Sequence, residues 1–156
     1  GIAAGIAEEW LMRFCVLIIL LKLLQNFRYQ IIGAVLLDGL IFGILHIANL
    51  IEQPIPATIL QMINASVASI TFAANYLNTG SFFINMGYHA VFDILAFLAF
   101  GTTVMTNPTV FEWQYLILTT LIYLTFLFFL LSGVDEYSLQ QWRLADNHGV
   151  SKLTYF

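Results

Sequence analysis

Acidic and basic side chains occur inside long apolar stretches of this 156-residue chain, where ionised groups are costly. Insertion scales put a charged residue at the middle of a membrane helix at about 2.5–3.5 kcal/mol. Such residues need partners or contact with water, and by default they are candidate functional groups. The alternative is a network of ion pairs that only holds the helices together. The residues concerned are Glu8, Glu9, Arg13, Asp38, His46, His89 and Asp93.

The spacing in the first of these stretches separates two neighbouring carboxylates. Consecutive helical residues lie about 100° apart around the axis, so Glu8 and Glu9 should point in different directions. Glu9 and Arg13 are four residues apart, a spacing that brings side chains together, so Glu9 should neutralise Arg13. Glu8 is then left without a local counter-ion. An isolated carboxylate in an apolar bundle is a good candidate for general acid–base chemistry near neutral pH.

Two histidines in other stretches are each accompanied by an acid at helical spacing. His89 and Asp93 are four residues apart and share a helix face. Asp38 and His46 lie eight residues apart along a slowly drifting stripe. Asp38 could support His46 or act as a second counter-ion for Arg13, and the spacing favours neither. Two histidines with acids on separate helices indicate a catalytic or ligand site more strongly than a single buried histidine does.

The composition places these residues in a membrane. The chain is 60% hydrophobic and 9% charged, whereas a soluble domain is roughly 45–50% apolar and about 25% charged. We therefore expect the lipid bilayer to surround the chain. The formal net charge of −4 argues against a nucleic-acid partner, because binding nucleic acid needs a basic patch. A single cysteine, Cys15, excludes a disulfide within the chain.

Five apolar stretches approach the length of about 20 residues that a membrane-spanning helix needs. Polar residues, prolines or a glycine separate them, as expected at helix ends. The expected fold class is therefore all-α, a polytopic transmembrane helical bundle with about five spans. The spans are expected at residues 1–24, 31–51, 56–77, 82–105 and 110–131.

The chain is expected to consist of a transmembrane bundle, residues 1–132, and a polar C-terminal tail, residues 133–156. Residues 1–7 already look like the interior of a helix, so we expect the bundle to lack an N-terminal part. The third stretch is rich in Ala and Ser, which lets helix backbones approach closely and indicates a central position. The fifth is almost uniformly apolar and is expected to face lipid.

Three short motifs together resemble those of the CPBP family, which contains the CAAX proteases and bacteriocin-processing enzymes and is also called Abi. Residues 8–13 fit the pattern Glu-Glu-x-x-x-Arg, residues 42–46 fit Phe-x-x-x-His, and residues 89–93 fit His-x-x-x-Asn/Asp. Each pattern alone recurs by chance. All of them in family order, each inside an apolar stretch, form a specific signature that covers about residues 5–97.

The resemblance implies an intramembrane endopeptidase that cleaves a peptide or protein substrate at the membrane, such as a prenylated or bacteriocin-type peptide. By this resemblance, Glu8 activates water and His46 helps to hold that water. His89 and Asp93 lie on the side of the site where the oxyanion forms. The family's range implies an integral protein of the bacterial cytoplasmic membrane. Further residues in and near the motifs are expected to support the site structurally: Glu9, Arg13, Phe42 and Asp38.

The third motif departs from the CAAX-cleaving members, which have Asn where this chain has Asp93. Asn can donate a hydrogen bond to a developing oxyanion, whereas an ionised Asp cannot donate one and would repel the oxyanion. Asp93 must then be protonated, or orient His89, or ligate a metal.

A metal-dependent site is one alternative. His46, His89 and a carboxylate from Glu8 or Asp93 could supply the protein ligands of a divalent metal such as zinc. The chain has no His-Glu-x-x-His pattern, so no direct zinc signature is present. No other cofactor is expected.

A non-enzymatic membrane scaffold or bacteriocin self-immunity protein is the other alternative. The same polar residues would then only hold the fold. Glu8→Gln should preserve the function of such a protein wherever it folds, and should abolish the function of a protease. A transporter would be indicated by inverted repeats or broken helices, and the sequence shows neither.

Overall fold

The computed structural model describes residues 2–100 and 106–132, most of which are helical. No strand occurs in these ranges. The all-α fold class predicted from the sequence is therefore confirmed. The predicted polar tail, residues 133–156, lies outside the described residues.

The first apolar stretch forms three consecutive helical pieces rather than one uniform helix. These are α1 (Ile2–Glu9), the π-helix η1 (Trp10–Val16) and α2 (Leu17–Leu23). In a π-helix each backbone N–H bonds to the carbonyl five residues back instead of four, and such segments are frequent at functional sites. The expected helical periodicity did not reveal this change, which begins directly after the acidic doublet and includes Arg13.

The remaining helices follow the predicted spans closely. The second stretch forms an α-helix that continues into a 3₁₀-helix beginning at His46. Because the two run end to end, they still form one long apolar segment. The elements are α3 (Gln30–Leu45), η2 (His46–Ile51), α4 (Ile55–Thr79), α5 (Phe82–Phe100) and α6 (Val110–Ser132).

The ends of α4 and α6 depend on residue types that were visible in the sequence. Pro56 lies in the first turn of α4, where its missing N–H has no helical partner to lose. Gly80 ends α4 with a φ of +69°, a left-handed conformation that favours glycine. At the start of α6, Glu112 Oε2 accepts hydrogen bonds from the Thr109 N–H at 2.6 Å and the Thr109 hydroxyl at 2.9 Å. This pair stabilises the first turn.

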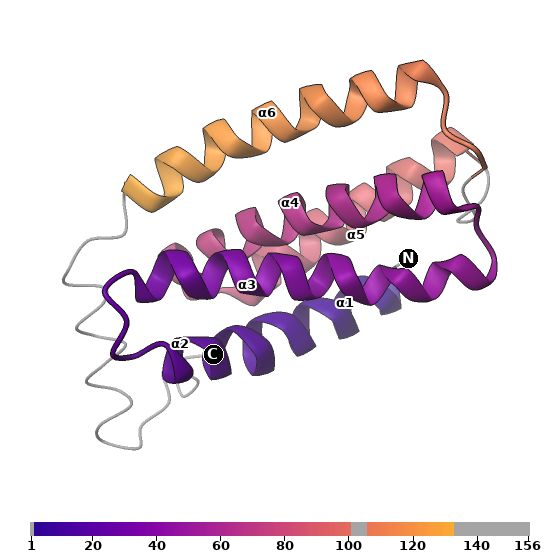
Figure 1. Cartoon of the computed structure of the whole chain (residues 1–156). Coiled ribbons are helices and arrows are strands. Elements are labelled where there is room, and N and C mark those ends of the chain that lie inside the picture. Colours follow the sequence, from indigo (N-terminus) through magenta and orange to yellow (C-terminus); the bar gives the residue numbers. More distant parts are fainter. Residues whose placement is uncertain (1, 101–105, 133–156) are drawn as a thin grey trace.

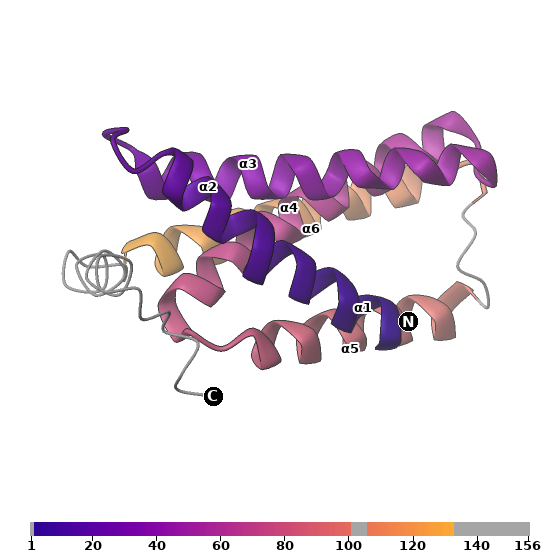
Figure 2. The same ribbon diagram turned by 90° about the horizontal axis from the view of Figure 1, so that it is seen from below.

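Helix α4 lies at the centre of the bundle, as its small residues predicted. It packs against α3, α5 and α6, and α6 runs along the upper edge in Figure 1. Seen from below, the α1–η1–α2 segment crosses the bundle diagonally (Figure 2). Its α1 end packs on α5 and its α2 end packs on α3. The segment that carries the acidic doublet therefore reaches both α5 and α3.

Two glycines allow α3 and α4 to approach closely. A methyl group added at Gly39 would lie 2.7 Å from the backbone oxygen of Ser66, and one at Gly43 would lie 2.6 Å from the backbone oxygen of Met62. Both distances are shorter than real carbon contacts allow. The glycines are one helical turn apart, a spacing typical of tightly packed membrane helices.

A cluster of buried apolar side chains joins α2, α3 and α4. Its α3 members, Ala34 and Val35, lie near the start of that helix, whereas His46 follows its end. The acids and histidines that could do chemistry therefore lie toward the other end of α3. The cluster comprises Leu17, Leu20, Ala34, Val35, Ala73, Tyr76 and Leu77.

Three of the described helical segments are long and apolar enough to cross a membrane, namely Gln30–Ile51, Ile55–Thr79 and Val110–Leu130. Only 6% of the third segment is buried inside the structure, compared with 33% and 44% of the other two. The outer surface of α6 is therefore open to lipid, and the molecule is a helical membrane bundle. The count of five spans stays a prediction.

Candidate active site

Arg13 is fully buried and directs its guanidinium at three different helical segments. Its Nε donates to Oε2 of Glu9 at 2.9 Å, Nη1 donates to Oδ2 of Asp38 on α3, and Nη2 donates to Oγ of Ser69 on α4 at 2.7 Å. The Ser69 hydroxyl in turn donates to Oδ2 of Asp38 at 3.1 Å. All of these side chains have 0% exposure. This buried charge cluster, defined as Glu9, Arg13, Asp38 and Ser69, ties the first segment to α3 and α4.

The cluster decides between the roles that the sequence left open for Asp38. Asp38 pairs with Arg13 rather than supporting His46. The predicted pair of Glu9 and Arg13 is also present. Sequence reasoning treated Ser69 only as a small packing residue. A buried ion pair needs hydrogen-bonding neighbours to satisfy its remaining donors and acceptors. This rule predicts that such a neighbour exists, but it does not identify Ser69.

His89 projects from α5 between the two carboxylates of the acidic doublet. Its Nδ1 lies 3.3 Å from Oε1 of Glu9, and its Nε2 lies 3.4 Å from Oε2 of Glu8. The same Nε2 is 3.9 Å from Oδ1 of Asp93, one turn further along α5. Glu8 and Glu9 thus point in different directions, as expected, yet both reach the same imidazole from different edges. The sequence did not predict that Glu8 has a counter-ion candidate on another helix.

The carboxylates at the two edges of the His89 ring differ in how exposed they are. Glu9 is fully buried, whereas the side chains of Glu8 and Asp93 are 40% and 33% exposed. The Nδ1 edge is therefore anchored in the interior, and the Nε2 edge opens outward. A carboxylate beside an imidazole nitrogen on an accessible edge can move a proton and stabilise a developing negative charge.

His46 lies at the junction of α3 and η2, and its Nδ1 is 2.9 Å from the backbone oxygen of Phe42. Because a carbonyl oxygen only accepts, Nδ1 carries a proton, and in the neutral tautomer with this proton Nε2 is an acceptor. The Phe42 ring packs edge-on against both histidines, with ring centroids 4.9 Å from His46 and 6.1 Å from His89. Glu8 and Asp93 both lie beside Nε2 of His89. The structure thus brings Glu8, His89 and Asp93 into contact, and the Phe42 ring separates His46 from this group.

A pair of asparagines, which the sequence analysis did not single out, holds α5 against α4. Asn85 is fully buried one turn before His89, and its Nδ2 donates to the backbone oxygen of Phe72 at 2.8 Å. Nδ2 of Asn75 donates to Oδ1 of Asn85 at 2.6 Å. The Phe72 ring lies 5.9 Å from the ring of His89. The missed signal was the four-residue spacing of Asn85, His89 and Asp93, which puts them on one face of α5.

The predicted metal alternative requires His46, His89 and a carboxylate to face one point. Among the residues that the structure describes, no group of three His, Cys, Asp or Glu side chains could hold a metal ion. Both nitrogens of His89 already face carboxylates, and Nδ1 of His46 faces a carbonyl oxygen. The donor atoms in this arrangement therefore do not fit a three-ligand metal site.

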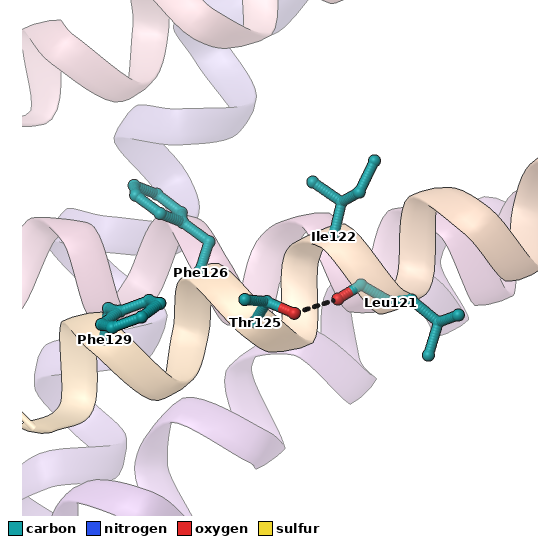
Figure 3. Close-up of a pocket in the computed structure, with 5 residues that line it drawn as sticks. All are labelled: Leu121, Ile122, Thr125, Phe126 and Phe129. Atoms are coloured by element: carbon teal, nitrogen blue, oxygen red, sulfur yellow. Dashed lines mark hydrogen bonds between the residues drawn. The ribbon is translucent and has the colours of Figure 1, made fainter.

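A separate, shallow and wide-open apolar pocket lies on the exposed surface of α6. Figure 3 shows its lining, and the hydroxyl of Thr125 is bonded to the backbone oxygen of Leu121 at 2.8 Å. The pocket offers no acid or base, so it is a surface for apolar contact rather than for catalysis. Its lining residues are Leu121, Ile122, Thr125, Phe126 and Phe129.

The comparison with known families matches the part of the chain that carries the site. Residues 1–95 match the family described as type II CAAX prenyl endopeptidase Rce1-like, and this range contains the doublet, both histidines and Asp93. No curated protein and no solved structure matches the chain. The resemblance to CAAX proteases that the motifs predicted is confirmed. Because the match covers more than half of the 156 residues, the chain belongs to the type II CAAX prenyl endopeptidase Rce1-like family of membrane proteases.

Proposed function

We propose that the chain is a glutamate-dependent intramembrane endopeptidase that hydrolyses a peptide bond of a membrane-associated peptide. The observation that supports this most is the accessible edge of His89, where Oε2 of the half-exposed Glu8 lies 3.4 Å from Nε2. A base and a proton-bearing ring stand side by side at an exposed edge, and the proposed hydrolysis requires water to reach this edge. Family membership supports the reaction class, and the geometry supports the residues.

In the proposed reaction Glu8 takes a proton from water while the water oxygen attacks the carbonyl carbon of the scissile bond. Nε2 of His46 accepts a hydrogen bond from the same water and so holds it in place. The carbonyl oxygen becomes an oxyanion as the tetrahedral intermediate forms. The C–N bond then breaks, Glu8 returns its proton to the departing amine, and the other product leaves as a carboxylate.

His89 is proposed to stabilise the oxyanion. The ionised Glu9 only accepts hydrogen bonds, so Nδ1 of His89 carries a proton. A second proton on Nε2 makes the ring cationic, and this proton can be donated to the oxyanion. Asp93, 3.9 Å from Nε2, would orient the ring rather than contact the oxyanion. This role accounts for an Asp in a position where CAAX-cleaving members have Asn.

Substrates of the proposed enzyme are peptides held at the membrane, with a prenylated C-terminus or a bacteriocin-type peptide as the two chemical classes to compare. The apolar surface beside the site supports such substrates, because a lipid-anchored peptide reaches it by diffusion within the bilayer. Residence in a bacterial cytoplasmic membrane is part of the same proposal.

The test is Glu8→Gln, assayed in proteoliposomes with a fluorogenic peptide carrying a farnesylated CAAX terminus and with an unprenylated apolar peptide. Loss of general-base catalysis should lower kcat by about 10²–10⁴-fold. The free energy of unfolding should change little, because the Glu8 side chain is 40% exposed and Gln keeps its shape. Glu52→Gln is the matched control, since Glu52 is exposed at the end of η2. Cleavage by Glu8→Gln at the wild-type rate would refute the assignment.

The buried charge cluster also supports the second candidate, a scaffold or self-immunity protein. Its members are sealed from water, which is what a purely structural network requires. Under this reading wild-type protein cleaves neither peptide, and Glu8→Gln retains whatever binding the wild type has.

A further inference from the structure

Ser69 uses its hydroxyl differently from the other serine and threonine residues of α4. Serine and threonine in helices commonly bond back to the carbonyl four residues earlier. Thr58, Ser66, Thr71 and Thr79 all do so, with distances of 2.8–3.3 Å. Ser69 instead accepts a hydrogen bond from Arg13 and donates one to Asp38. Its hydroxyl is directed out of α4 into the buried charge cluster.

A guanidinium is a planar fork, so fixing one side of it fixes the direction of the other nitrogen. Ser69 and Asp38 hold the two terminal nitrogens of Arg13. The remaining Nε then points at Oε2 of Glu9, and the other oxygen of that carboxylate contacts Nδ1 of His89. A continuous series of polar contacts therefore runs from α4 through the first segment to the catalytic edge of α5.

We propose that Ser69 is a positioning residue for His89, acting through Arg13 and Glu9, an inference that rests on the proposed function for its catalytic consequence. Its hydroxyl orients the Arg13 guanidinium and thereby keeps Nδ1 of His89 on Glu9 and Nε2 toward Glu8. Ser69 itself is fully buried, away from the exposed Nε2 edge of the ring.

Loss of the Ser69 hydroxyl should rearrange the buried charge cluster. Without Ser69, Nη2 of Arg13 loses its acceptor and Oδ2 of Asp38 loses a donor. Oδ1 of Asp38 has no hydrogen-bond partner among the described residues, so it is a free acceptor toward which Nη2 can turn. Removing the hydroxyl should therefore turn the guanidinium and release Glu9 from its fixed contact with the His89 ring.

The experiment compares Ser69→Ala with Ser66→Ala, the same substitution one helical turn earlier on α4. Ser66 bonds only to the Met62 backbone oxygen in the described structure, at 2.8 Å. Misplaced catalytic groups lower rates by about 10–100-fold. Ser69→Ala should lose kcat in this range with KM within about twofold, and the pH profile of kcat/KM should shift. Ser66→Ala should keep the wild-type profile.

A second readout does not depend on activity. Nitrogen NMR of histidine-labelled protein reports the protonation pattern of each ring, and the His89 signals are assigned with His89→Gln. Ser69→Ala should change the His89 signals, and Ser66→Ala should leave them unchanged. If no variant cleaves any peptide but the His89 signals change as expected, the positioning role stands and the proposed function fails. Unchanged His89 signals in folded Ser69→Ala overturn the positioning role.

Where Ser69→Ala does not fold, Ser69→Thr and Ser69→Val replace it, because these side chains share a shape and differ in the hydroxyl. Ser69→Thr should retain the wild-type His89 signals and Ser69→Val should not. Equal spectra for the two variants overturn the proposal.

Discussion

The imidazole of His89 contacts carboxylates that differ in their surroundings. Glu9 is sealed in the interior with Arg13, whereas Glu8 and Asp93 are partly exposed. Positioning and chemistry are thereby assigned to different edges of one ring. Because the buried edge is fixed by charge, substrate arriving at the open edge should meet a ring whose orientation is already set.

The residue at position 93 provides a direct prediction. Asp93→Asn should keep kcat within about tenfold of wild type, because Asn keeps the shape and can itself donate a hydrogen bond to the oxyanion. Asp93→Ala should lower kcat further, because it removes the polar group at position 93 that orients His89. Initial rates in proteoliposomes measure both. If Asp93→Asn is as inactive as Asp93→Ala, the negative charge itself is essential.

Local spacing was enough to predict contacts within one helix and not those between helices. The pair of Glu9 and Arg13 follows from a separation of four residues. The partner of Asp38 could not be chosen in advance, because it depends on how α3 is rotated relative to the first segment. Ser69 was missed for the same reason, since its hydrogen bonds cross between helices.

At the scale of helices, the boundaries were largely predictable because they depend on local residue types. Prolines, Gly80 and the apolar run lengths gave the limits of α4 and α6 to within a few residues. The π-helix η1 was not predictable in this way. Hydropathy reports which residues are apolar, whereas the change from α to π alters only the pattern of backbone hydrogen bonds.

The close approach of α3 and α4 leads to a prediction for Gly39→Ala. The added methyl would meet the Ser66 backbone oxygen at 2.7 Å, so the helices must separate. Overpacking of this kind costs about 1–3 kcal/mol. Thermal unfolding in detergent measures the loss. Gly87→Ala on α5 is the control, because no atom lies within 4 Å of the added methyl, and it should be neutral or stabilising by up to about 1 kcal/mol. Equal stability of the two variants would contradict the packing.

At the scale of the whole molecule, the polar site and the lipid-facing surface are separated. The site joins α1, α3 and α5 around α4, whereas α6 contributes apolar side chains to the outside and none of the site residues. The composition predicted the bilayer as solvent, and the almost uniformly apolar fifth stretch predicted that α6 would face lipid. The sequence could not predict which side of α4 each neighbouring helix occupies.

The exposed apolar surface predicts that the chain stays with the membrane rather than in the aqueous phase. Washing membranes with alkaline carbonate should leave the protein in the pellet, and detergent should release it. The reason is that helices such as Val110–Leu130 expose large apolar side chains that water cannot solvate favourably. Immunoblotting of both fractions measures this, with a peripheral protein as the released control. Recovery in the carbonate supernatant would contradict a membrane-integrated fold.

The backbone of η1 has a consequence for how much the length of the first segment can vary. Its hydrogen bonds skip one more residue than those of an α-helix, so the stretch Trp10–Val16 holds an extra residue in its turns. Losing one residue there would let an ordinary helix form, with Glu8 still toward α5 and Leu17 still toward α3. Gaining one would swing the doublet away from His89. This point of the chain should therefore tolerate the deletion of one residue better than the insertion of one.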